Sequence, residues 1–168
     1  MRTSGTTRDE LLARAVRLRE QGHHEDARQQ LMELAGQYPE DCEVAYQTAW
    51  AHDVLGLEAE AVPFYERSLN GSGLSTEDRR GALLGLGSTY RTLGQYAKAV
   101  STLRQAVKEY PDDGALQTFL AMALFNVDDH HEAMRILLTL LATTSEDSNV
   151  RRYQRAIQHY AQDLNATV

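Results

Sequence analysis

Small and apolar residues recur along the chain in a register of about 34 positions. One set of equivalent positions carries turn-forming residues, which are Gly22, Gly56, Gly94 and Asp128. An alanine follows each of them five residues later, at Ala27, Ala61, Ala99 and Ala133. The intervals are 34, 38 and 34 residues. The same intervals relate two further sets, which are Leu31, Tyr65, Leu103 and Leu137, and Ala15, Ala49, Gly87 and Ala121. Coincidence does not produce so many matches, so the chain consists of four repeats.

Each repeat predicts two helices joined by a tight turn. In the third repeat, two apolar stripes at helical spacing flank the turn; they consist of Leu83, Leu86, Gly87 and Tyr90, and of Ala99, Leu103 and Ala106. Gly94 lies between the stripes, where glycine tolerates the left-handed conformation of such a turn. The small residues allow paired helices to approach closely, and Leu31 with its equivalents fills the layer between neighbours. No apolar period is near 2, so the fold class is all-α.

The register also sets the boundaries of a single domain over residues 8–164. The repeats span about 8–41, 42–79, 80–113 and 114–147, after a flexible tail at 1–7. The four extra residues of the second interval fall in a loop after Asn70, and Ser75 and Thr7 have capping side chains for the helices that follow them. An amphipathic stretch at 148–164, with Val150, Tyr153, Ile157, Tyr160 and Leu164 on one face, predicts one capping helix. Residues 165–168 form a second tail, and nine helices are expected in total.

The third repeat, from Leu83 through Ala99 to Pro111, closely resembles the tetratricopeptide repeat (TPR) signature. The other repeats resemble it with departures at Ala45, His52, Gln117 and Asp128. Through the runs 56–66 and 81–90, the whole chain is similar to small stand-alone bacterial TPR proteins. The resemblance implies a right-handed solenoid of αα-hairpins and no specific activity. The 15 arginines against 2 lysines are compatible with a bacterial source.

The resemblance further implies that the first helix of each repeat lines a concave groove. The groove residues would then be Leu12, Val16, Arg19, Tyr46, Gln47, Trp50, Asp53, Leu84, Ser88, Arg91, Thr118, Phe119, Met122 and Phe125. Aromatic, aliphatic and arginine side chains of this kind are typical of protein interaction surfaces. The sequence therefore predicts a protein interaction module that binds a helix or an extended peptide, and its partner is a protein or peptide of unknown identity.

Two alternatives remain open for this groove. The capping helix or a second copy of the chain fills it, which would make the protein a self-associating structural module or a homodimer. Alternatively, Trp50 or Phe119 belongs to the core. One subtype of ligand is disfavoured, because the clamp that holds a terminal carboxylate in chaperone-binding relatives needs lysine, asparagine and arginine. Those positions here carry Leu12, Val16, Gln47, Gly81 and Gly85.

Charge and hydropathy exclude several other partners. A formal net charge of −7, with no clustered basic face in the sequence, argues against nucleic acid. No apolar run is long enough for a membrane span, and the polar amino terminus lacks a secretory core, so we expect a cytoplasmic protein without membrane contact. Cys42 is the only cysteine and is interpreted as a reduced structural thiol.

The sequence predicts no enzyme, no cofactor and no metal site. It contains no phosphate-binding glycine loop, nucleophile elbow or HExxH motif. The pairs His23-His24 and His130-His131 fall in turns of the first and fourth repeats, too far apart for a shared metal site. His52 and Asp53 are a poor catalytic pair, because consecutive helical residues point about 100° apart.

Overall fold

The computed structural model describes residues 7–167, so the predicted tail at 1–7 lies outside the described residues except for Thr7. Over residues 7–167 the chain forms ten α-helices and no strand, as the all-α prediction requires. It comprises two compact units, with the boundary between Leu93 and Gly94.

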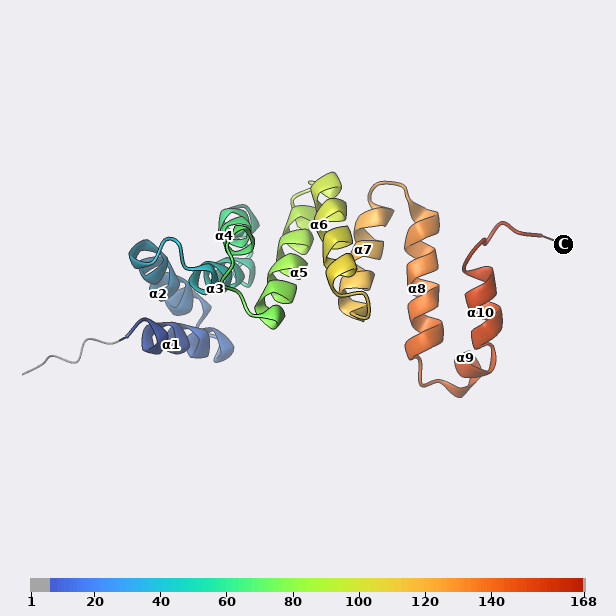
Figure 1. Ribbon diagram of the computed structural model, residues 1–168, viewed down its shortest axis with the longest axis horizontal. Helices are drawn as coiled ribbons and strands as arrows, with labels where there is room; N and C mark the ends of the chain where they lie inside the picture. Colours follow the sequence, from blue (N-terminus) through green and yellow to red (C-terminus); the bar gives the residue numbers. More distant parts are fainter. Residues whose placement is uncertain (1–6, 168) are drawn as a thin grey trace, which may run out of the picture. The chain divides into compact units, whose positions relative to one another are not determined.

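The first unit contains two αα-hairpins and one further helix (Figure 1). α1 (Arg8–Glu20) pairs with α2 (His24–Gln37), α3 (Cys42–Asp53) pairs with α4 (Glu58–Asn70), and α5 (Thr76–Thr92) packs on α4. α2 also packs on α3, so the hairpins stack in sequence order. α3 also contacts α1 and α5, the first helices of the neighbouring repeats.

Side-chain caps fix where these helices begin. Thr7 and Glu10 form the predicted capping box, in which the Glu10 amide donates to Thr7 Oγ1 at 3.3 Å and the Thr7 amide donates to Glu10 Oε2 at 2.9 Å. Asp41 caps α3 by accepting from the Val44 amide at 3.0 Å. Ser75 caps α5 as predicted. Each cap satisfies an amide that the helix itself leaves unpaired.

The turns between the two helices of each repeat have the predicted left-handed residues. Gly22, Gly56 and Gly94 have φ of 86°, 72° and 72°. Asp128 replaces glycine in the last repeat and has φ of 62°. Aspartate tolerates this conformation better than most residues. The positive φ of Asp128 confirms the turn predicted there.

The core of the first unit follows the repeat register. Ala15, Ala27, Leu31, Ala49 and Ala61 are each 0% exposed. Leu31 also belongs to a cluster that joins the first hairpin to the second through Leu12, Leu34 and Val44. The small residues permit the close packing of the helix pairs, and Leu31 fills the layer between them.

The second unit contains α6 (Tyr96–Glu109), the hairpin of α7 (Gly114–Phe125) and α8 (His130–Thr144), and two short helices, α9 (Ser148–Arg152) and α10 (Gln154–Tyr160). α7 packs on α6, and α10 packs on α8. The expected count of nine helices is wrong, because the capping segment breaks at Tyr153. This residue has φ of −101° and ψ of 10°, and its amide bonds in the tighter pattern of a helix end.

The capping segment does not bury the face that the sequence assigned to it. Tyr153, Tyr160 and Leu164 are 57%, 60% and 47% exposed, whereas Ala161 is buried. Leu137 was expected to fill the layer between neighbours, and this expectation is also wrong, because 39% of it is exposed. The break at Tyr153 shortens the cap to a helix of seven residues, which covers only part of α8.

Candidate functional site

The first helices of the repeats bring several predicted groove residues of the first unit together. We call this region the α1–α3–α5 surface and define it by Arg19, Tyr46, Gln47, Trp50 and Asp53. Arg19 comes from the end of α1, and the other four come from one side of α3 at helical spacing.

Arg19 lies at the centre of the α1–α3–α5 surface. It is only 6% exposed, its Nη1 donates to Gln47 Oε1, and its guanidinium lies 3.6 Å from the centroid of the Trp50 ring. Within the described residues Arg19 forms no ion pair, and burial lowers the pKa of its guanidinium. A buried cation needs such compensating contacts. The Gln47 amide and the Trp50 ring therefore fix the position of the Arg19 guanidinium, and Arg19 in turn orients both side chains.

Trp50 is the large aromatic side chain of this surface that remains open to solvent. Its ring lies 5.9 Å from the ring of Tyr46, which in turn lies 6.4 Å from Tyr65. Trp50 is 40% exposed, whereas Tyr46 and Tyr65 are 6% and 2% exposed. Burial raises the pKa of Tyr46 to about 12, so this phenol stays neutral. The two tyrosines are the buried support of an accessible indole.

Asp53 connects three helices beside this aromatic group. Tyr65 Oη donates to Asp53 Oδ2 at 2.6 Å, and Thr89 Oγ1 donates to the same carboxylate at 3.0 Å. Burial raises the pKa of Asp53 in spite of these hydrogen bonds. Burial, together with the nearby Asp53, also raises the pKa of the Tyr65 phenol. Asp53 therefore links α3 to α4 and α5 rather than presenting a free carboxylate.

Two glycines of α5 leave room for the buried tyrosines. A Cβ on Gly85 would overlap the ring of Tyr65, and a Cβ on Gly81 would overlap the Tyr46 hydroxyl. Tyr65 is buried and bonded to Asp53, so its ring has little freedom to move. Larger side chains at these two positions would require a different tyrosine arrangement.

The remaining groove candidates differ in accessibility. Leu12 lies in the core with Leu31 and Leu34, and Val16 packs against that cluster. On α5, Leu84, Ser88 and Arg91 are partly buried. On α7 in the second unit, Thr118, Phe119 and Met122 are partly buried, whereas Phe125 is 61% exposed. Residues of the first unit therefore form the described surface, with Trp50 as its most accessible aromatic residue.

Tyr65 and Thr89 take part in this arrangement, although neither was predicted as a site residue. The register assigned Tyr65 to packing and gave Thr89 no role, and both residues are buried. Their hydroxyl groups could have indicated this role from the sequence, since a buried hydroxyl requires a hydrogen-bond partner. Asp53 supplies that partner to Tyr65 within its own repeat and to Thr89 in the next repeat.

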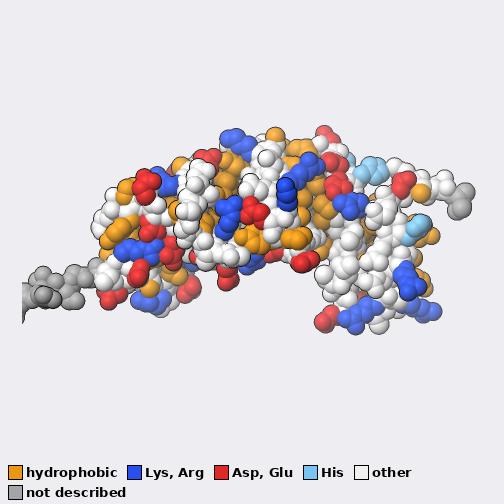
Figure 2. All heavy atoms as spheres, in the orientation of Figure 1, with side chains coloured by type: hydrophobic (Ala, Val, Ile, Leu, Met, Phe, Trp, Pro, Cys, Tyr) orange, Lys and Arg blue, Asp and Glu red, His pale blue; other side chains and the backbone are white. Residues whose placement is uncertain are grey.

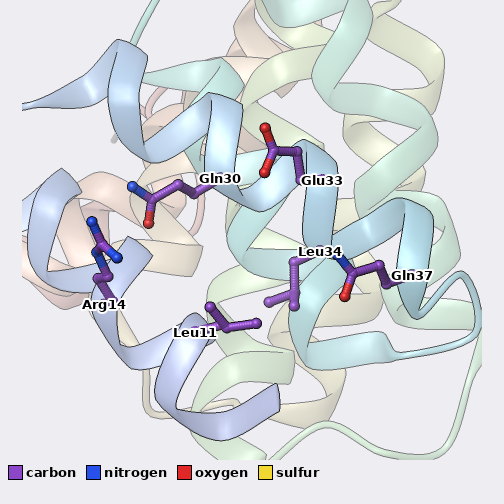
Figure 3. Close-up of a pocket in the computed structure, with 6 residues that line it drawn as sticks. All are labelled: Leu11, Arg14, Gln30, Glu33, Leu34 and Gln37. Atoms are coloured by element: carbon purple, nitrogen blue, oxygen red, sulfur yellow. The ribbon is translucent and has the colours of Figure 1, made fainter. Parts of the chain in front are cut away.

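A pocket of about 270 Å³ lies between α1 and α2 rather than at this surface. Figure 3 shows its six lining residues, with Leu11 and Leu34 approaching one another among the polar side chains of Arg14, Gln30, Glu33 and Gln37. None of these six belongs to the predicted groove. The mixed lining lacks the convergent polar groups on an apolar wall that typify small-molecule sites.

Acidic and basic side chains are not segregated on the face of the first unit that Figure 2 shows. Acidic and basic side chains are intermixed over α1 to α5 in Figure 2. Several are paired, including Arg8 with Asp41 at 2.7 Å and Arg28 with Glu25. Within residues 7–167, no helix has both the length and the apolar character needed to cross a membrane.

The family sequence model described as Tetratrico peptide repeat matches residues 42–164. The chain belongs to the tetratricopeptide repeat family. The match begins at the first residue of α3 and continues through the capping segment, so it includes the last three repeats. A comparison with curated proteins found no match.

Solved structures agree with this TPR assignment at the level of the fold. MamA 41-end from Desulfovibrio magneticus RS-1 has a TM-score of 0.72 at 19% identity, over 92% of this chain and 88% of that chain. A MamA double mutant, RS-1 ArsTM, has a TM-score of 0.72 at 17% identity, over 92% and 79%. A Podosopora anserina protein with nearly identical TPR-like repeats of the kinesin light chain type has a TM-score of 0.68 at 20% identity, over 94% and 85%. All three likenesses support an all-α TPR repeat fold.

Proposed function

We propose that the α1–α3–α5 surface binds a polypeptide, with the Trp50 ring as its principal contact. The TPR fold is that of a protein–protein interaction module, and TPR proteins are generally non-enzymatic scaffolds. The observation that carries the finer proposal is the accessible Trp50 ring, 40% exposed above a buried arginine and a buried tyrosine. Tryptophan is among the residues most enriched at the energetic centres of protein interfaces.

Preorganisation strengthens this proposal. The guanidinium of Arg19 lies on one face of the Trp50 ring, and the amide of Gln47 orients that guanidinium. A side chain that is already held in its bound orientation loses less conformational entropy when a ligand arrives. A tryptophan that belonged to the core would be largely buried, whereas Trp50 is 40% exposed. A helix or an extended peptide that lays an apolar side chain on the indole is the ligand that this surface favours.

Truncation of Trp50 tests the proposal. Peptides selected from a displayed random library against the native chain provide the probe, and their dissociation constants are measured by calorimetry. Trp50→Ala should weaken binding by about 30-fold, which corresponds to about 2 kcal/mol for an aromatic interface anchor.

The matched control is Met32→Ala, because Met32 on α2 is 41% exposed and lies outside the proposed surface. This variant should bind within about twofold of the native chain, as residues outside an interface do. Circular dichroism establishes that both variants are folded. A folded Trp50→Ala chain with native affinity for the selected peptides would refute the proposal.

A further inference from the structure

An apolar stripe on α8 is open to solvent. Met134, Leu137 and Leu141 are 44%, 39% and 46% exposed, and their spacing places them on one face of the helix. The position of Leu137 is filled in the three preceding repeats by Leu31, Tyr65 and Leu103, which are 0%, 2% and 0% exposed. The position that is buried at the centre of this face in every earlier repeat is therefore exposed in the last one.

The first helix of the following repeat covers this face elsewhere in the chain. In α3, which packs on α2, the residues Val44, Thr48 and Ala51 are each 0% exposed, and Thr48 Oγ1 donates to the Leu31 carbonyl at 3.4 Å. α9 and α10 occupy the corresponding place after α8, but the break at Tyr153 separates them into two short helices. The stripe on α8 consequently lacks the cover that α3 gives to α2.

The opposite end of the repeat array cannot supply that cover from another copy. The positions on α1 equivalent to Val44, Thr48 and Ala51 carry Glu10, Arg14 and Arg17, and all three are exposed. Head-to-tail stacking would press these charges against the leucines of α8. Burying charges against an apolar surface without partners is strongly unfavourable, so this mode of association is disfavoured.

Charge favours contact between two α8 helices instead. The chain has a net charge of −7, yet residues 130–168 contain four acidic and four basic side chains and are neutral. α8 itself carries no charged residue between Ile136 and Thr144. Two copies repel one another over much of their surface, and this neutral segment is where the repulsion is smallest.

We infer that two copies of the chain associate through α8, with the helices antiparallel about a two-fold axis near Leu137. Met134 lies about one turn before Leu137 and Leu141 about one turn after it. The two-fold rotation therefore places Met134 of one copy opposite Leu141 of the other, and every contact along the stripe is apolar. Removing this surface from water is the driving force for the dimer.

Sedimentation equilibrium of the native chain and two aspartate variants tests this inference. The native chain should form a reversible dimer, and Leu137→Asp should raise its dissociation constant at least tenfold, because two buried carboxylates would face each other. Met32→Asp is the matched control, since Met32 is 41% exposed on α2, and it should dimerise like the native chain. Leu141→Asp provides a second variant if Leu137→Asp disturbs the helix. A native chain that is monomeric at all accessible concentrations would overturn the inference, as would dimerisation unaffected by both α8 variants.

Cross-linking locates the interface. A Leu137→Cys chain should form a disulfide-linked dimer under mild oxidation, because the two-fold axis brings the two cysteines together, whereas Met32→Cys should not. The native thiol does not interfere, since Cys42 is buried. A dimer that is weakened by Trp50→Ala but not by Leu137→Asp would place the second copy on the α1–α3–α5 surface, and this result would also overturn the inference.

Discussion

At the residue scale, the sequence correctly predicted the backbone conformation of Asp128. It did not predict how deeply neighbouring side chains bury Arg19. Asp128 was expected to tolerate a left-handed turn, and its φ of 62° confirms this. Arg19 was expected on an open surface, yet it is 6% exposed because Trp50 and Gln47 enclose its guanidinium. A sequence shows which way a helical residue points but not how much the long side chains of neighbouring helices cover it.

Asp53 makes a prediction at this scale. Burial raises the pKa of Asp53 in the folded chain above its value in the unfolded chain, so the folded state holds the proton more tightly. The associated stability is present below the unfolded pKa, about 3.9, and is lost as the pH rises through the folded pKa. Asp53→Asn cannot ionise, so its free energy of unfolding relative to the native chain should increase as the pH rises from about 4 to 7.

Urea denaturation at a series of pH values measures this difference. Asp112→Asn, at an exposed position between α6 and α7, is the control and should not show the same trend. The account of Asp53 would be contradicted by a difference between Asp53→Asn and the native chain that stays constant over this range.

At the element scale, the signals that depend on residues close together in the sequence correctly predicted where helices begin. The capping box at Thr7 and the cap at Ser75 were predicted and are confirmed, because they depend on residues within three positions of one another. The last helix was predicted as a single cap, but it breaks at Tyr153. Its apolar residues Tyr153 and Tyr160 remain exposed, and helical periodicity alone does not show whether a neighbouring helix covers them.

Ala99 tests the packing of α6. It is 0% exposed, whereas Ala97 on the same helix is exposed. Ala99→Leu should overpack the interior and lower the free energy of unfolding by about 1–3 kcal/mol. Ala97→Leu should change it by less than about 0.5 kcal/mol, as surface substitutions do. Chemical denaturation measures both values, and equal stability of the two variants would mean that the repeat register is assigned to the wrong face of α6.

At the scale of the whole molecule, the repeat register was sufficient to predict an all-α TPR fold, since the same small residues return at every interval. It was not sufficient to predict the candidate site. Tyr65 and Thr89 converge on Asp53 from two other helices, and Gly81 and Gly85 make room for the two tyrosines. Contacts of this kind depend on how the helices pack within a repeat and between neighbouring repeats. The extension of the proposed surface to Phe119, Met122 and Phe125 stays a prediction.

The central claim is that a polypeptide binds at Trp50, and the emission of this only tryptophan reports on it directly. The native chain is titrated with a selected peptide that lacks tryptophan, and the emission maximum is recorded. An indole that is 40% exposed in the free protein should become shielded from water, so the account predicts a saturable blue shift. The midpoint of that shift should equal the calorimetric dissociation constant. An emission maximum that stays unchanged when the peptide saturates the chain would contradict the account.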